Sequence, residues 1–135
     1  MNPLFLIDTN TCIRFINGRA PQLRTKLLSM KHENIVVCSV VKAEMYYGSM
    51  KSQTPEVSLQ KQQRFLDQFD SLPFDDAAAR QYGAIRAVLE KRGTPISHHD
   101  LQIAAIALEN NLVLVTHNLR EFSRVEGLFL EDWEI

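Results

Sequence analysis

The amino-acid sequence predicts an α/β fold in which helices flank a central parallel sheet of four to five strands. Continuous apolar runs at 4–7 and 112–115 are typical of strands buried on both faces of a parallel sheet. Segments with helix start and stop signals separate such runs, as in βαβ units. A length of 135 residues, with 45% hydrophobic residues and no break in composition, predicts one domain over 1–135.

Local signals set the expected helices. Pro21 and Pro55 suit the first turn of a helix, Ser39 is a natural N-cap, and Ser97 opens a later helix. Gly93 suits a helix end, after a start at Asp75 or Asp76. The expected helices are 9–17, 21–32, 39–48, 55–70, 75–93 and 97–110.

Short apolar segments complete the expected sheet. Pro73 restricts its segment to a sheet edge, because proline has no N–H to donate to a neighbouring strand. The expected strands are 4–7, 35–38, 72–74, 112–115 and 128–130.

Composition excludes several classes of protein. Cys12 and Cys38 lie among apolar neighbours and are expected to be buried thiols rather than a disulfide framework. The apolar run at 4–7 is too short for a signal peptide, and no stretch reaches the ~18 apolar residues of a membrane span, so we expect a cytoplasmic protein with no membrane partner. Net charge falls from +3 over 1–50 to 0 over 51–100 and −4 over 101–135. A positive half of this size is only a weak indication of a phosphate-bearing partner.

Polar residues follow three of the expected strands. Asp8 comes directly after the first, Ser39 after the second, and Thr116, His117 and Asn118 after the fourth. Ligands of open parallel sheets bind beyond the carboxyl ends of the strands, so these positions are candidates for a site. Asp8 has an equally simple alternative role as the N-cap of the helix that follows it.

Glu44 is a carboxylate on an apolar helix face. Its neighbours one turn away are Val40, Val41, Tyr47 and Gly48. A buried carboxylate must be paired, protonated or bound to a metal. A wet helix edge or a salt bridge to an arginine is the alternative.

Asp100 repeats this pattern, because apolar residues follow it at 103, 104 and 107. A capping box with Ser97 is the alternative explanation for Asp100. Glu121, beyond the fourth expected strand, is by default an exposed loop residue. Together with Asp8 and Glu44, these carboxylates predict a site for a hard cation, Mg²⁺ or Mn²⁺, which would assist phosphoryl hydrolysis.

Other catalytic motifs fit less well. The chain has no Gly-Lys for a phosphate-binding loop and no Gly-x-Ser-x-Gly nucleophile turn. A haloacid-dehalogenase-like phosphatase would need a second aspartate where Asn10 stands. His98 and His99 are adjacent on a helix and so point about 100° apart, which disfavours a shared zinc ion. His32 and His117 have no recognisable partner in the sequence.

Four segments in order resemble the PIN domain, and more closely the VapC-type toxin ribonucleases of bacterial toxin–antitoxin pairs, and a fifth segment near residue 130 is also typical of that group. The resemblance covers nearly the whole chain, and it depends on the order and spacing of the segments rather than on any one of them. The segments are LIDTN at 6–10, AEMYYG at 43–48, DLQIAA at 100–105, THNLREF at 116–122 and LEDW at 130–133.

The resemblance implies roles for individual residues. Asp8, Glu44 and Asp100 would be the core metal-binding acids, and Glu121 would be the acid of the last motif. Asn10, Thr116 and Asn118 match polar positions that support the acids. Ser97 stands where the family commonly has glycine, which affects the loop before Asp100. The candidates for RNA contact are Arg14, Arg19, Arg24 and Arg120.

The resemblance also implies an activity and partners. Water activated by Mg²⁺ or Mn²⁺ would hydrolyse an RNA phosphodiester, with tRNA or another structured RNA as substrate, leaving 5′-phosphate and 3′-hydroxyl ends. The chain would form a homodimer and be inhibited by a small cognate antitoxin protein. A non-catalytic PIN-like module that binds RNA or a protein partner is the alternative, which metal titration would separate.

Overall fold

A five-stranded parallel sheet forms the centre of the computed structural model, which describes residues 4–135. The strands follow the order β3-β2-β1-β4-β5, and every neighbouring pair is parallel. This confirms the predicted fold class. The strands are β1 (Phe5–Ile7), β2 (Ile35–Cys38), β3 (Asp70–Leu72), β4 (Val113–Val115) and β5 (Leu130–Glu131).

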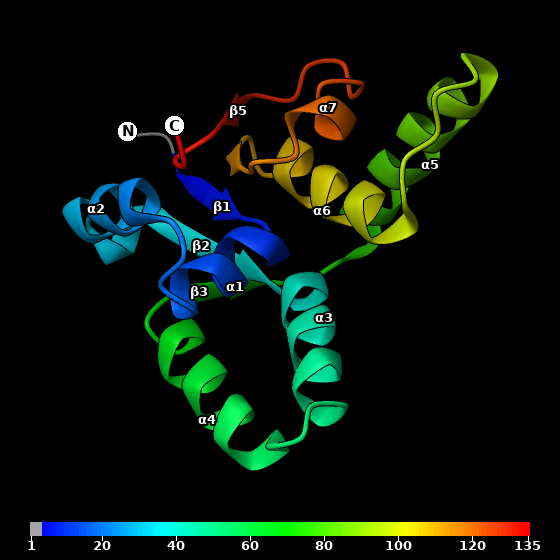
Figure 1. Ribbon diagram of the computed structural model, residues 1–135. Coiled ribbons are helices and arrows are strands. Elements are labelled where there is room, and N and C mark those ends of the chain that lie inside the picture. The colour runs from blue at the N-terminus through cyan, green and yellow to red at the C-terminus, as the bar shows by residue number, and fades with distance from the viewer. Residues whose placement is uncertain (1–3) are drawn as a thin grey trace.

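Helices connect the strands and cover the sheet. In Figure 1, α3 and α4 run together away from the sheet as a helical hairpin, while α5 and α6 pack on each other at upper right. The helices are α1 (Thr9–Ile16), α2 (Pro21–Ser29), α3 (Ser39–Met50), α4 (Pro55–Leu66), α5 (Asp76–Lys91), α6 (His98–Glu109) and α7 (Leu119–Phe122), with a 3₁₀ turn η1 (His32–Asn34).

Side-chain caps fix the start of three helices. Asp8 Oδ1 accepts a hydrogen bond from the Thr11 N–H at 2.9 Å, and Asp75 Oδ1 accepts one from the Ala78 N–H at 2.9 Å. Ser97 Oγ accepts a 3.3 Å bond from the N–H of Asp100. These bonds satisfy N–H groups that have no partner within the helix. The predicted starts at Asp75 and Ser97 are confirmed.

Several predicted helix boundaries are wrong by one to four residues. Helix α2 ends at Ser29 because Met30 has extended backbone, with ψ of 150°, before the turn η1. Helix α4 ends at Leu66 rather than 70, and Asp67 is its C-cap. Ser39 is the first helical residue of α3 rather than its N-cap, which is Cys38, and the helix ends at Met50 rather than 48.

Strand pairing corrects the two expected edge strands. Asp70 and Ser71 pair with Val36 and Val37, so β3 lies before Pro73, which cannot donate to the sheet. The last strand lies at Leu130–Glu131 rather than 128–130, because its register with β4 sets its position. Both strands lie at the edges of the sheet.

The core lies on both faces of the central strands. All residues of β1 and β2 are buried, as predicted for strands inside a parallel sheet. Cys12 and Cys38 are buried free thiols, which confirms that prediction. Trp133 packs against Phe5 with ring centroids 5.2 Å apart and so holds the C-terminal segment on β1. Within residues 4–135, no helix combines the length and apolar character needed to cross a membrane.

Candidate functional site

The carboxyl ends of β1 and β4 lie side by side and carry two of the predicted site residues, Asp8 and Thr116. The Asp8 N–H donates to the Val115 carbonyl at 3.1 Å, which continues the pairing of the two strands. Asp8 is only 5% exposed, and Thr116 is also buried. The strand-end prediction therefore places both residues correctly.

Asp8 both caps α1 and lies at the strand end, so the two interpretations of this residue are compatible. Burial raises the pKa of its carboxyl group, and hydrogen bonds from Thr11 and Thr116 lower that pKa by a smaller amount. The negative charge of Glu134 adds to the increase in pKa. A nearby cation would stabilise the charged form of this buried group.

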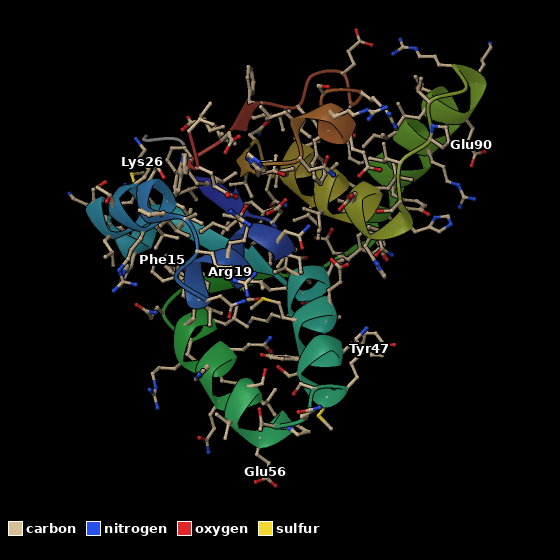
Figure 2. All side chains as sticks on the ribbon, in the orientation of Figure 1. Phe15, Arg19, Lys26, Tyr47, Glu56 and Glu90 are labelled. Atoms are coloured by element: carbon tan, nitrogen blue, oxygen red, sulfur yellow. The ribbon has the colours of Figure 1, made fainter. Side chains whose placement is uncertain are left out.

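Glu44 joins three helices at the same edge of the sheet. Its Oε1 accepts a 2.6 Å hydrogen bond from the Thr9 hydroxyl, and its Oε2 lies 3.2 Å from His99 Nδ1. Its side chain is 27% exposed. The predicted apolar helix face around Glu44 is only partly buried. Val40 and Val41 are buried, but Tyr47 is 66% exposed and projects outward from α3 (Figure 2).

The carboxyl groups of Asp100 and Glu121 lie close enough to affect each other's charge. The pKa of Asp100 is raised to about 7, first by burial, then by the hydrogen bond to Glu121 and its charge, and to a smaller extent by Asp8. Two carboxyl groups in contact must share a proton or be compensated by a cation. The negative charges of both Glu121 and Asp8 therefore act on the Asp100 carboxyl group. We call Asp8, Glu44, Asp100 and Glu121 the acidic edge.

Glu121 lies in the one-turn helix α7 and is half-buried, which corrects its default assignment to an exposed loop. The Asn118 side-chain amide donates to Glu121 Oε2 at 2.6 Å. The Asn118 N–H in turn donates to the Thr116 hydroxyl oxygen at 2.9 Å. Thr116 and Asn118 therefore position one of the acids, as polar support residues would.

A cavity of about 420 Å³ opens beside Asp8. The exposed side chain of Asn10 contributes to its wall, so this predicted support residue borders the site rather than being buried in it. The cavity is lined by Asp8, Asn10, Ile13, Arg14, His117 and Asn118.

The four candidate arginines have different surroundings. Arg14 lines the cavity and is ion-paired with Glu134. The Arg24 guanidinium lies 5.6 Å from the centre of the Phe15 ring. Arg19, just beyond α1, and Arg120, in α7, are exposed (Figure 2 labels Arg19). Only Arg14 is part of the cavity wall.

The histidines have partners that the sequence did not reveal. His98 Nδ1 lies 3.0 Å from the Tyr82 hydroxyl, whereas His99 contacts Glu44, so the two adjacent rings serve different contacts. The sequence offers no recognisable partner for His117, but in the structure its Nδ1 lies 2.8 Å from Asp132 Oδ2. The pairing of β4 with β5 causes this contact, because it joins segments fifteen residues apart.

The donors of the acidic edge are carboxylate oxygens, which are the ligands that Mg²⁺ and Mn²⁺ prefer. This donor set, in which the pKa values of Asp8 and Asp100 are raised, thus fits a divalent cation. The four acids come to one edge of the sheet, but the ligand atoms that, in the described part of the chain, lie closest together as a group of three belong to other residues. Within residues 4–135, the three potential ligand atoms that lie within 4.8 Å of one another belong to His117, Asp132 and Glu134.

Comparison with known families identifies the class of protein. The PIN domain model matches residues 5–128. The chain belongs to the PIN domain family.

Individual relatives narrow this class. The chain is 38% identical over 129 residues to the tRNA(fMet)-specific endonuclease VapC of Salmonella typhimurium, covering 96% of this chain and 97% of the relative. It is 36% identical over 132 residues to ribonuclease VapC2 of Rickettsia felis, covering 97% and 98%. These matches confirm the predicted resemblance to the VapC-type ribonucleases.

Solved structures agree with this assignment. The DNA-bound VapBC of Salmonella typhimurium contains a chain with a TM-score of 0.91 and 37% identity, covering 98% of this chain and 99% of that one. The VapBC2 complex of Rickettsia felis, bound to a promoter DNA fragment, gives a TM-score of 0.89 and 35% identity, covering 96% and 98%.

Proposed function

We propose that this chain is the toxin of a toxin–antitoxin pair and acts as a metal-dependent endoribonuclease. The observation that carries the proposal is the acidic edge, where the carboxyl group of Asp100 contacts Glu121 beside the buried Asp8. Such crowding of like charges costs folding free energy unless a proton or a cation compensates it. Carboxyl groups with strongly shifted pKa values are commonly found in active sites.

Asp8, Asp100 and Glu44 would hold Mg²⁺ or Mn²⁺, and Glu121 would support a second ion or the attacking water. The ion, when bound, would activate water and stabilise negative charge on the phosphate. Thr9 and His99 fix both oxygens of the Glu44 carboxylate. Asn118 orients Glu121.

The proposed reaction is hydrolysis of an RNA phosphodiester. A water oxygen forms a bond to phosphorus in line with the leaving group, and the bond from phosphorus to the 3′-oxygen breaks. The products carry a 5′-phosphate and a 3′-hydroxyl. Arg14 in the cavity wall, with the exposed Arg19, Arg24 and Arg120, would bind the RNA backbone.

Relatives support a substrate and a partner. A 38% identical relative is named a tRNA(fMet)-specific endonuclease, so we propose tRNA as the substrate. Similar chains are found in VapBC complexes, so we propose a cognate antitoxin of the VapB type, together with a homodimer of this chain. We expect the protein to act in the cytoplasm, where the thiols of Cys12 and Cys38 would remain reduced.

Cleavage of total tRNA by the purified, antitoxin-free chain tests this proposal. We expect cuts with Mg²⁺ or Mn²⁺, none with chelator, and a loss of at least about 100-fold in Asp8→Asn and Asp100→Asn, since metal ligation supplies several kcal/mol of catalysis. Asp75→Asn is the matched control: asparagine still caps α5, and cleavage should be unchanged. Full cleavage by Asp8→Asn or Asp100→Asn would contradict the assignment. RNA binding without cleavage by the folded chain would favour the non-catalytic module.

A further inference from the structure

A second group of ligating side chains lies outside the acidic edge. His117 follows β4, while Asp132 and Glu134 follow β5 near the C-terminus. One potential ligand atom from each lies within 4.8 Å of the other two. We call these three residues the C-terminal cluster. The pairing of β4 with β5 and the packing of Trp133 on Phe5 hold it in place.

Burial makes the two carboxylates of the C-terminal cluster costly. The side chains of Asp132 and Glu134 are each only 5% exposed. Arg14 donates to Glu134 Oε1 and so compensates one negative charge. Glu134 Oε2, however, is buried and has no hydrogen-bond partner within the described residues 4–135. A buried carboxylate oxygen without a partner is expensive to maintain, so this atom points to a missing ligand.

The spacing of these atoms is close to, but not equal to, that of ligands around one metal ion. Two ligand atoms that are each about 2.0–2.2 Å from one tetrahedral ion lie about 3.3–3.6 Å apart. His117 Nδ1 and Asp132 Oδ2 are hydrogen-bonded at 2.8 Å, so these two atoms would have to separate by about half an ångström to share one ion. One imidazole nitrogen with two carboxylate oxygens is a donor set for a borderline transition metal, whereas Mg²⁺ prefers oxygen ligands alone.

We propose that His117, Asp132 and Glu134 bind one divalent transition-metal ion of the Zn²⁺ class, separate from any ion at the acidic edge. Three protein ligands would leave one position of a tetrahedral ion open for water or a phosphate oxygen. His117 lines the same cavity as Asp8, so the open position would lie beside the proposed nuclease site. The ion would add positive charge where an RNA phosphate enters the cavity.

The same atoms also form contacts that need no metal. His117 is hydrogen-bonded to Asp132, and Glu134 is ion-paired with Arg14. In this alternative the C-terminal cluster only fastens the last residues of the chain, and Zn²⁺ would have no specific affinity for it. Binding measurements separate the two cases.

Calorimetric titration with Zn²⁺ of the Asp8→Asn/Asp100→Asn double variant is the test, because this variant lacks two acids of the proposed nuclease site. We expect one bound Zn²⁺ per chain. Adding His117→Asn or Glu134→Gln should weaken binding at least tenfold, since each removes or neutralises a ligand. His32→Asn is the matched control, because His32 lies against Phe69, remote in sequence from the C-terminal cluster, and should leave binding unchanged.

A folded double variant that binds no Zn²⁺ would overturn the proposal, as would binding that His117→Asn and Glu134→Gln leave unchanged. If the double variant does not fold, the visible absorption of Co²⁺ bound to the otherwise unaltered chain serves instead. A His117→Asn change that removes one component of that spectrum supports the site, and an unaltered spectrum overturns it. Both readouts measure binding, so they decide this inference independently of RNA cleavage.

Discussion

The acidic edge and the C-terminal cluster bring carboxylates together in two different ways. In the acidic edge, Asp100 contacts another carboxyl group, and its pKa rises to about 7. In the C-terminal cluster, each carboxylate has a cationic or ionisable partner, His117 for Asp132 and Arg14 for Glu134. Glu44 has such a partner in His99, so the difference indicates that Asp8, Asp100 and Glu121 are the acids whose charges are left for a ligand to compensate. In the C-terminal cluster, a single buried oxygen is left in this way.

The largest expected effect separates activity from stability at the acidic edge. Asp100→Asn should reduce metal-dependent RNA cleavage at least about 100-fold. The same change should raise the free energy of unfolding in chelator, because it removes a carboxyl group that contacts Glu121. Cleavage assays and urea unfolding of the same sample measure both. A variant that loses stability along with activity would assign Asp100 a structural role.

The next effect concerns the C-terminal cluster and its anchor. Trp133 is 4% exposed, and its indole N–H donates to Glu131 Oε1 at 2.9 Å. Trp133→Ala should lower the free energy of unfolding by about 3–5 kcal/mol, through lost packing on Phe5. Trp133→Phe is the milder control. A loss below about 1 kcal/mol in Trp133→Ala would show that the C-terminal segment is not held by this contact.

The free energy of unfolding should depend on pH because of the acidic edge. The pKa values of Asp8 and Asp100 are raised in the folded chain, that of Asp100 to about 7. Folding therefore takes up protons, and this contribution to stability is fully present below the unfolded carboxyl pKa and is lost as pH rises through about 7. In chelator, the urea midpoint should thus be higher at pH 5.5 than at pH 8. Asp100→Asn should flatten this difference, whereas an identical pH profile in the variant would show that Asp100 does not cause it.

The smallest expected effect lies on the surface around both regions. Arg19→Gln and Arg120→Gln should each weaken tRNA binding a few-fold. Each should also reduce the slope of the logarithm of the binding constant against the logarithm of the salt concentration by about 1. Both side chains are exposed, so the free energy of unfolding should change little. Binding titrations at several salt concentrations measure this, with Arg80→Gln, an exposed position on α5, as control. Equal losses in all three variants would indicate only a general charge effect.

Much of the fold and part of the site could be predicted because local patterns determine them. Buried apolar runs give the central strands, and the residue after a parallel strand gives Asp8. Asp100 is recognisable because Ile103, Ala104 and Ala107, which lie one and two turns after it, are apolar and buried. The contact of His117 with Asp132 could not be predicted, since it depends on the register of β4 and β5. Tyr47 is exposed because α3 extends away from the sheet, as Figure 1 shows, and no local pattern indicates this.

Diffraction from crystals grown with Mn²⁺, with anomalous scattering used to locate the ion, is the most direct test of the acidic edge as a metal site. We predict an anomalous peak within bonding distance of carboxylate oxygens of both Asp8 and Asp100. Crystals of Asp100→Asn grown under the same conditions should lack that peak. A folded, Mn²⁺-saturated chain with no peak at Asp8 and Asp100 would contradict the assignment of a metal site to the acidic edge.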